Sequence, residues 1–306
     1  MFDRRYFPAL LLALMPLVAS AADPIKQDKD DCKQQEQREG KGDKTSDVVC
    51  AVKIMFQNRI RRKKDDEPVE MIVGSPPMVT DDTDTPGAGN WEINLVAVGE
   101  FAGSEHRIEA PIFDVNYGMG DRLQFTYELP FVFQAELQPT AGGERVVHAQ
   151  GIGDSNFGVK YRFYDNEDRG ISFAVYPQIE FRTPGANRDV SEGSNAFILP
   201  VLMTIEFEHS AIGAEAGVEA SSGERRYFGS FGVGGRANDK LAIMAEIAGT
   251  DLNAADEKRV LVNIGLRRKL NATQTVSAGF GRDIYAGGDQ RRNNYVSFAY
   301  QKQFGD

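Results

Sequence analysis

The stretch LQFTYELPFVF, residues 123–133, decides the fold because apolar and polar side chains alternate along it. The apolar face of the stretch consists of Leu123, Phe125, Tyr127, Leu129, Phe131 and Phe133, and the polar face holds Gln124, Thr126 and Glu128. A period of two residues is the pattern of a β-strand. At this length, with one face so rich in aromatic residues, it is typical of a strand that crosses a membrane between lipid and a polar lumen.

The same pattern recurs from Asn90 to the end of the chain, in segments of about ten residues separated by turn residues. We expect these strands to begin near Trp91, Arg107, Leu123, Phe157, Phe173, Phe197, Ile212, Tyr227, Leu241, Val260, Thr275 and Tyr295. Single-chain outer-membrane barrels normally have an even number of strands. Residues 90–306 therefore predict an all-β fold, a transmembrane antiparallel up-and-down β-barrel of about 12 strands.

The connections between these strands alternate in length. The links after even-numbered strands are short and comprise residues 118–121, 165–170, 208–210, 237–239 and 269–272. Several links after odd-numbered strands are longer, namely residues 134–150, 183–194, 249–258 and 284–293. Short turns on the periplasmic side and longer loops outside are typical of these barrels. The pattern therefore places both ends of the barrel sequence in the periplasm.

Residues 1–22 have the pattern of a secretory signal peptide. Arg4 and Arg5 precede an apolar run from Pro8 to Val18, and small residues follow at 19–22. A retained membrane anchor is the alternative, but the run is shorter than the about 20 residues that a spanning helix needs. We expect a secreted protein of the Gram-negative cell outer membrane.

Residues 23–89 differ in composition from the barrel sequence. Lys26 to Lys44 contains almost no apolar residue, which favours a flexible periplasmic segment. A plug folded into the barrel lumen, or a docking peptide for a partner, is the alternative. Cys32 and Cys50 form an even pair in an oxidising compartment, which favours a disulfide that closes a loop in this segment. A metal or redox pair is the less favoured interpretation because no histidine is nearby.

Composition also restricts the partners. The chain has 45 acidic and 35 basic residues, a net charge of −10, so no nucleic-acid partner is expected. We expect contacts with outer-membrane lipids and with a small-molecule solute. The last strand, with Phe298, Tyr300 and Phe304, has the aromatic pattern that the barrel-assembly machinery recognises. No cofactor and no metal site is expected.

The inward face of the predicted barrel carries many charges. The expected pore-lining residues are Glu92, Asp114, Glu128, Lys160, Arg162, Glu180, Arg182, Glu206, Glu246 and Arg267. An ion pair between Glu128 and Lys160 is expected because they lie on adjacent strands. Two interpretations stay open for these charges: a hydrogen-bonded lattice that fills the lumen and an electrostatic constriction that selects solutes.

The later strands place glycines on the inward face. This glycine arc consists of Gly213, Gly217, Gly232, Gly234, Gly265, Gly279 and Gly281. Glycine in a strand often marks a close approach of backbone or ligand. The arc therefore predicts a lopsided lumen, with free space or a plug against the glycines. Leucine at Gly232 and Gly279 should then reduce flux.

Catalysis has little support in the sequence. Outer-membrane lipid hydrolases use a serine that a histidine activates. His106 and His148 fall in predicted outer loops or at the rim, His209 falls in a short turn, and the sequence has no G-x-S-x-G motif. We expect no catalytic residues. A non-conducting barrel that anchors its N-terminal segment or an envelope partner is the alternative to a channel.

The order and spacing of several short motifs resemble an outer-membrane family named for the meta-cleavage pathway of phenol degradation. These motifs are PGAGNWEI (86–93), Ala110-Pro111 with Asp114 and Tyr117, GDRLQ (120–124), YELP (127–130), GIGDS (151–155), KYRF (160–163), Tyr176-Pro177, Thr183-Pro184-Gly185, Leu199-Pro200, Glu246 and Gly281-Arg282-Asp283. The resemblance covers Pro86 to Phe304. It implies an outer-membrane barrel that transports small aromatic or hydrophobic compounds, and it supplies no established binding residues.

Overall fold

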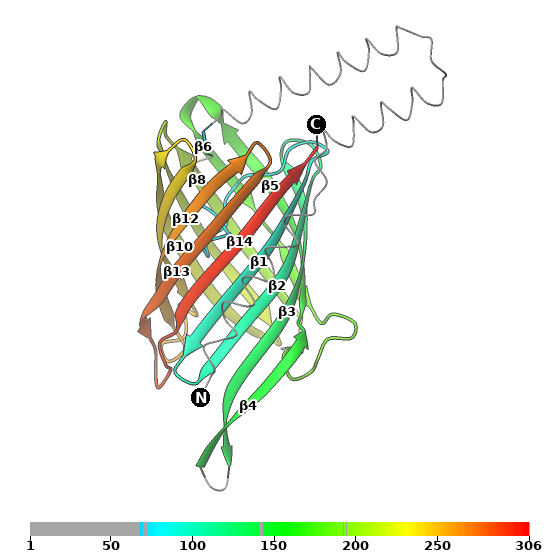
Figure 1. Cartoon of the computed structure of the whole chain (residues 1–306), viewed down its shortest axis with the longest axis vertical. Helices are drawn as coiled ribbons and strands as arrows, with labels where there is room; N and C mark the ends of the chain where they lie inside the picture. The colour runs from blue at the N-terminus through cyan, green and yellow to red at the C-terminus, as the bar shows by residue number, and fades with distance from the viewer. Residues whose placement is uncertain (1–67, 70–72, 141–142, 192, 194, 306) are drawn as a thin grey trace, which may run out of the picture. The chain divides into compact units, whose positions relative to one another are not determined.

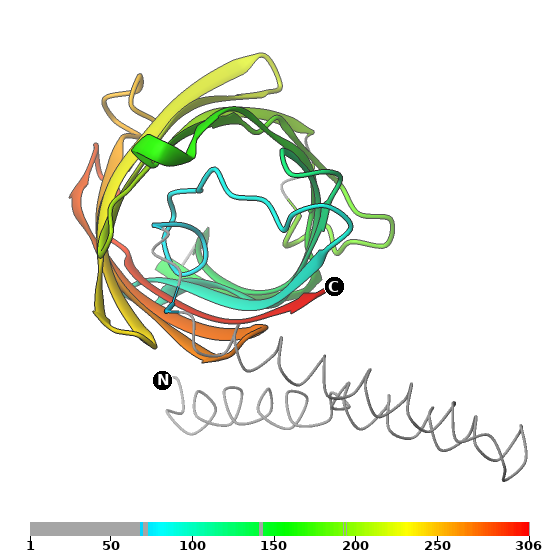
Figure 2. The same ribbon diagram turned by 90° about the horizontal axis from the view of Figure 1, so that it is seen from above.

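The computed structural model describes residues 68–69, 73–140, 143–191, 193 and 195–305. Its strands form one antiparallel sheet that closes on itself (Figures 1 and 2). The closure joins the first and last strands, in register from Trp91 opposite Phe304 to Phe101 opposite Asn294. The predicted signal peptide, residues 1–22, and the predicted disulfide between Cys32 and Cys50 lie outside the described residues.

The sheet contains fourteen strands, and one short 3₁₀ helix, η1, lies between two of them. Their bounds are β1 Trp91–Ala102, β2 Glu105–Gly118, β3 Leu123–Thr140, β4 Gly143–Ile152, β5 Ser155–Asn166, η1 Glu167–Arg169, β6 Ile171–Val175, β7 Gln178–Phe181, β8 Ala196–Glu206, β9 Ser210–Ser221, β10 Glu224–Asn238, β11 Leu241–Thr250, β12 Arg259–Asn271, β13 Gln274–Ala286 and β14 Asn294–Phe304. The described residues contain no helix long and apolar enough to cross a bilayer.

Two of the barrel strands are interrupted, so the fourteen segments make twelve strands around the barrel. β4 and β5 both pair with β3, and they are separated at Gly153 and Asp154. β6 and β7 both pair with β5 and β8, and they are separated at Tyr176 and Pro177. Proline has no N–H for the ladder, but the Pro177 carbonyl still accepts a hydrogen bond from Val159 N at 3.0 Å. The predicted closed barrel of about 12 strands is confirmed.

The two faces of the wall differ as the alternation predicts. The exposed large apolar side chains on the strands include Phe113, Tyr127, Phe157, Tyr161, Phe197, Val201, Phe231, Val233, Ile243, Ile247, Ile264, Leu266 and Phe280. Buried polar or charged residues on the same strands include Asn94, Asn116, Gln124, Thr126, Lys160, Ser172, Thr204, Glu246, Asn263, Arg267 and Ser297. The apolar side chains form an outer surface that lipid can cover, and the polar side chains face the lumen.

The two ends of the barrel also differ. We call the end with the links after β2, β8, β10 and β12 the turn end, and the opposite end the loop end. The prediction of a long loop at residues 134–150 is wrong. β3 and β4 continue as a hairpin, paired from Phe131 opposite Ile152 to Thr140 opposite Gly143. The hairpin projects past the barrel (Figure 1) and buries neither face well, so its strands carry many polar residues. These polar residues are the reason that the sequence predicts a loop here.

Candidate functional site

Residues 73–85, which we call the luminal segment, lie inside the barrel (Figure 2). The chain approaches from the turn end, where Val69 N donates a hydrogen bond to Asp239 O at 2.7 Å. It returns to the same end, where Thr85 Oγ1 donates to Asp121 O at 3.0 Å. Residues 73–85 therefore enter and leave the lumen through one opening.

This position differs from the flexible tail that composition favours for residues 23–89. The described part of that range, from Val73 onward, corresponds to the plug alternative. Low apolar content predicts disorder when a segment has nothing to bury against, but here the barrel wall supplies partners for its polar groups. The rest of the range, residues 23–67 and 70–72, lies outside the described residues.

Glu246 on β11 is the main polar anchor of the luminal segment. Its carboxylate accepts hydrogen bonds from Val79 N at 2.7 Å, Thr80 N at 2.9 Å and Thr80 Oγ1 at 2.6 Å. It also accepts one from Asn263 Nδ2 on β12 at 2.9 Å. Glu246 is 4% exposed. Hydrogen bonds to a charged acceptor are stronger than neutral ones, so this side chain is expected to contribute most to holding the segment.

Side chains of β12 and β14 donate hydrogen bonds to backbone carbonyl groups of the luminal segment. Arg267 Nη2 on β12 donates to Gly74 O at 3.1 Å and to Pro76 O at 2.9 Å. Asn263 Nδ2 and Ser297 Oγ both donate to Pro77 O, at 3.3 and 3.1 Å. Backbone groups buried away from water need such partners, and here the wall provides them without any regular secondary structure in the segment.

The glycine arc lies against this segment. A Cβ atom on Gly213 would be 2.8 Å from Val73 O, and one on Gly232 would be 2.5 Å from Val73 Cγ1. On Gly265 it would be 2.3 Å from Met78 Cε and on Gly279 2.8 Å from Pro77 O. Side chains at these four positions would occupy the space that the segment fills.

The remaining three glycines of the arc have other neighbours. The Gly217 position is closed by the Phe228 ring and the Gly281 position by Leu261 and Val262. Gly234 pairs with Met244 and Ala211, which belong to the buried cluster of Val69, Val73, Met78, Ala211, Ala242 and Met244. Fully burying a valine or methionine side chain stabilises by about 1.5–3 kcal/mol, so this cluster adds an apolar contribution to docking.

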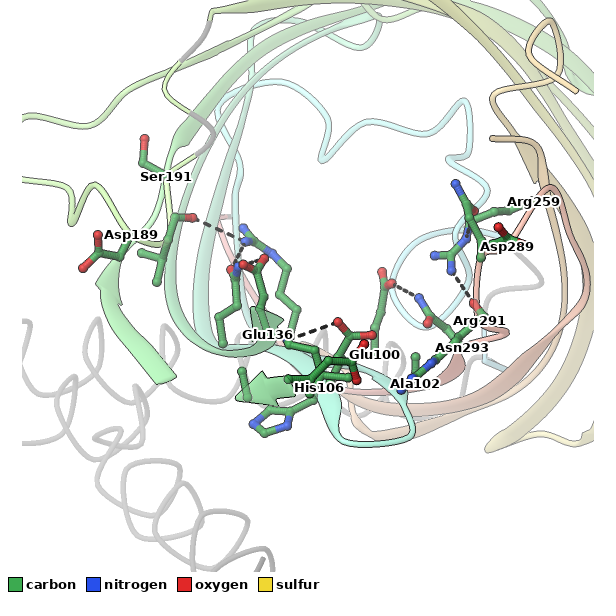
Figure 3. A pocket seen from close by; sticks show the side chains of 18 residues that line it. Glu100, Ala102, His106, Glu136, Asp189, Ser191, Arg259, Asp289, Arg291 and Asn293 are labelled. Atoms are coloured by element: carbon green, nitrogen blue, oxygen red, sulfur yellow. Dashed lines mark hydrogen bonds between the residues drawn. The ribbon is translucent and has the colours of Figure 1, made fainter. Parts of the chain in front are cut away.

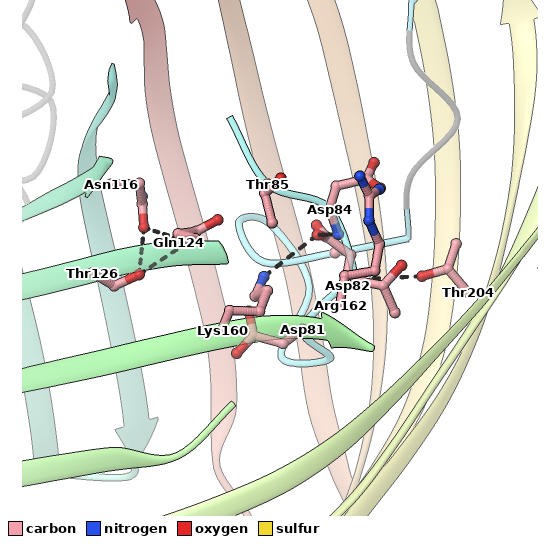
Figure 4. Close-up of polar contacts among 12 residues, drawn as sticks. Asp81, Asp82, Asp84, Thr85, Asn116, Gln124, Thr126, Lys160, Arg162 and Thr204 are labelled. Atoms are coloured by element: carbon pink, nitrogen blue, oxygen red, sulfur yellow. Dashed lines mark hydrogen bonds and ion pairs between the residues drawn. The ribbon is translucent and has the colours of Figure 1, made fainter. Parts of the chain in front are cut away.

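Ion pairs connect the second half of the luminal segment to β5 (Figure 4). Lys160 Nζ is 3.6 Å from Asp82 Oδ1, and Arg162 Nη1 is 3.3 Å from Asp84 Oδ1. The predicted ion pair between Lys160 and Glu128 is wrong. The antiparallel register places Glu128 opposite Asn156 and Lys160 opposite Gln124, so the two charges lie at different depths.

Four of the expected pore-lining carboxylates lie on the wall away from Glu246. Asn94 Nδ2 donates to Glu92 Oε1 at 3.1 Å and to Asp114 Oδ2 at 2.7 Å. Glu128 pairs in register with Asp114 on the neighbouring strand. Glu180 on β7 continues this side of the wall. Arg182, by contrast, follows the end of β7 with an exposed side chain, and Glu206 is exposed at the turn end of β8.

A cavity of about 810 Å³ forms the mouth of the lumen at the loop end (Figure 3). Its lining includes six acidic residues, Glu100, Glu105, Glu136, Glu144, Asp189 and Asp289, and three arginines, Arg107, Arg259 and Arg291. Arg107 Nε lies 2.8 Å from Glu109 Oε1, and Arg259 Nη2 lies 3.6 Å from Asp283 Oδ2. Two of the arginines are thus paired with carboxylates, which leaves the mouth with an excess of negative charge.

Sequence reasoning missed several residues of this site. The luminal partners Asp82 and Asp84 and the mouth residues Arg107 and Arg259 carried no signal of their own. Asn263 had a detectable signal, since it occupies an inward position of β12 between hydrophobic outward neighbours. His106 on β2 and His148 on β4 lie close together, with ring centroids 6.3 Å apart. His209 lies in the β8–β9 turn with Nε2 3.6 Å from Glu208 Oε1.

Leucine at Gly265 should displace the luminal segment and raise conductance. The added side chain would overlap the Pro77 ring, whose Cγ lies 2.7 Å from the Cβ position. Overpacking costs about 1–3 kcal/mol, which lowers the docked-to-undocked ratio about 5- to 150-fold. In a lumen without the segment, the same bulk would lower conductance. Single-channel recording distinguishes the two signs, with Gly235→Leu, on the outward face of the same sheet, as the control that should change nothing.

Comparisons with known proteins support the fold. No protein-family model matches the sequence, and no curated protein matches it. Among solved structures, the COG4313 outer membrane channel from Pseudomonas putida F1 is similar, with a TM-score of 0.55 and 14% identity over 73% of this chain and 98% of that one.

The KdgM porin in complex with disordered oligogalacturonate is also similar, with a TM-score of 0.50 and 8% identity over 70% of this chain and 99% of that one. At these identities the similarity shows a shared barrel fold. A shared fold does not assign the solutes of those two proteins to this chain.

Proposed function

We propose that this chain is an outer-membrane channel for small solutes, and that its luminal segment sets the width of the passage. The observation that carries the proposal is the polar mouth of about 810 Å³, lined by inward-facing residues of β1, β2, β3 and β12 and so continuous with the lumen. Twelve-stranded barrels lie between small barrels filled by side chains and large open porins. A segment held by side chains inside such a barrel narrows it.

The length of the connections supports the orientation of the channel. Outer-membrane barrels have short periplasmic turns and longer outer loops, so the turn end faces the periplasm and the mouth faces the exterior. Residues 73–85 then enter the lumen from the periplasmic side. This agrees with secretion by a signal peptide at residues 1–22 and with insertion by the barrel-assembly machinery into outer-membrane lipids.

The charge of the mouth favours small polar solutes, and cations among them. Carboxylate rings select cations in other channels, and six acidic residues face three arginines in this lining. Aromatic or other hydrophobic compounds, which the family resemblance implies, are the second candidate. Inward-facing Val96 and Leu202, 8% and 0% exposed, are the apolar surface that supports them.

Planar-bilayer recording of the refolded mature protein tests the channel. Discrete current steps are expected, and in a KCl gradient the reversal potential should indicate a preference for potassium over chloride. Asp289→Lys at the mouth should shift the reversal potential toward chloride, whereas Glu257→Lys, outside the mouth lining, should shift it less. A folded barrel without current steps would instead favour the anchoring alternative.

A further inference from the structure

Five polar residues form a continuous row across adjacent strands of the inner wall. We call it the carboxylate–amide row: Asn94 of β1, Asp114 of β2, Glu128 of β3, Asn156 of β5 and Glu180 of β7. Each member lies directly opposite the next in the strand registers. Residues opposite one another in a sheet lie within about 5.5 Å between their Cα atoms, so these side chains stand next to one another on the lumen side.

The row contains a buried acceptor that has no donor. Asn94 is 2% exposed, and its Oδ1 atom has no hydrogen-bond partner among the described residues. Its Nδ2 donates to Glu92 Oε1 and to Asp114 Oδ2. These two bonds fix the orientation of the amide, because a flipped amide would point oxygen at two carboxylates. A buried polar atom without a partner in a native protein calls for an explanation.

The same condition recurs further along the row. Asn156 Nδ2 donates to Gln178 Oε1 at 2.7 Å, and its buried Oδ1 atom has no partner among the described residues. Between the two asparagines, Glu128 makes neither a hydrogen bond nor an ion pair with a described residue. The row thus presents two amide oxygens and a carboxylate that all lack donors.

The nearby basic side chains form ion pairs with residues outside the row. Lys160 lies 3.6 Å from Asp82 and stacks over the Tyr176 ring at 5.0 Å. Arg162 is held by Asp84 and by Asp165, at 3.3 Å each. The luminal segment therefore pairs the cations of β5 with its own aspartates. Among the described residues, no ion pair joins a basic side chain to Glu128.

We propose that the carboxylate–amide row binds organic cations with several N–H groups, such as guanidinium or primary ammonium ions, on their way through the lumen. Such a cation supplies both the positive charge and the donors that the row lacks. Charge-assisted hydrogen bonds to carboxylates are the strongest of the common kinds. A quaternary ammonium ion has the same charge and no N–H group, so the row should discriminate against it. The inference rests on the proposed channel for access, and it names the solute class of that channel.

Calorimetric titration of the folded, detergent-solubilised protein tests this binding independently of conduction. Methylguanidinium chloride is the probe and tetramethylammonium chloride is the matched control, and only the first is expected to bind at moderate ionic strength. Glu128→Gln should lower the affinity for methylguanidinium about 10-fold or more. Glu257→Gln, on an exposed loop, should leave it unchanged. Asn156→Ala serves as a second row variant if Glu128→Gln does not refold.

Bilayer recordings separate this inference from the channel itself. Current steps that methylguanidinium reduces and tetramethylammonium does not would support both. Current steps with no binding of methylguanidinium would overturn the row and leave the channel. Binding to a protein that carries no current would support the row and overturn the channel. Equal binding of the two cations, or binding that both row variants leave unchanged, would overturn the row.

Discussion

Replacing Glu246 with leucine is expected to release the luminal segment and to enlarge the single-channel current. The substitution removes the acceptor of the Val79 and Thr80 N–H groups and of the Thr80 hydroxyl. Hydrogen bonds to a charged group contribute about 1.5–3 kcal/mol each. Luminal water that replaces some of them reduces the net loss. Even about 2 kcal/mol lowers the docked-to-undocked ratio about 30-fold.

Glu246→Gln is the matched variant, because it keeps the size and one acceptor oxygen and loses the charge. It should give an intermediate current, between those of the native protein and Glu246→Leu. Heat-modified mobility on gels checks that each variant has a folded barrel. If Glu246→Leu folds and its current equals that of the native protein, then the segment does not limit the passage.

A disulfide between the luminal segment and the wall should reverse the effect of Glu246→Leu. Thr80 Oγ1 and Ser230 Oγ are 2.8 Å apart, so cysteines at these two positions lie within reach of one another. In a background with Cys32 and Cys50 replaced by serine, the oxidised Thr80→Cys, Ser230→Cys, Glu246→Leu protein should give small currents. Reduction in the recording chamber should change them to the large currents of Glu246→Leu.

The single-cysteine proteins are the controls, and they should give large currents before and after reduction. A second pair, Thr83→Cys with Ser172→Cys, tests the other half of the segment, where the native hydroxyl oxygens are 2.6 Å apart. Oxidised proteins that keep the large current, with the bond verified by mass spectrometry, would show that segment position and current are unrelated.

The barrel could be predicted from the sequence because its signal is local and repeated. Each strand, such as residues 123–133, carries its own two-residue period, and twelve repetitions of a weak pattern give a confident strand count. Lipid outside and water inside impose the alternation on each strand separately. The β3–β4 hairpin escaped prediction because past the barrel rim neither environment constrains its side chains.

The candidate site could be predicted only in part. Alternation identified Glu246, Arg267 and the glycines as inward-facing, and the missing side chains at Gly213, Gly232, Gly265 and Gly279 indicated that something lies close to them. What lies there is residues 73–85, whose hydrogen-bonding partners are up to 220 residues away in the sequence. No local period records contacts at such separation, and a segment rich in Pro, Thr and Asp reads as a linker when its partners are not considered.

The carboxylate–amide row could also be predicted only in part from the sequence. Asp114, Glu128 and Glu180 follow from alternation alone. The position of Asn94 beside Asp114, and of Asn156 beside Glu128, depends on strand register, which the bulge between Val96 and Val98 and the break at Gly153 both shift. The expected pairing of Glu128 with Lys160 was wrong by four residues, because Asn156 is the residue opposite Glu128.

The entry and exit of residues 73–85 at one end of the barrel has a consequence for biogenesis. A strand threaded through a closed ring would have to be in place before the first and last strands pair. A loop whose two ends remain on the same side can instead be pushed in after β1 and β14 have joined, and it can be drawn out again without opening that seam. Barrel closure and segment docking are therefore separable steps, and the second can be repeated throughout the life of the protein.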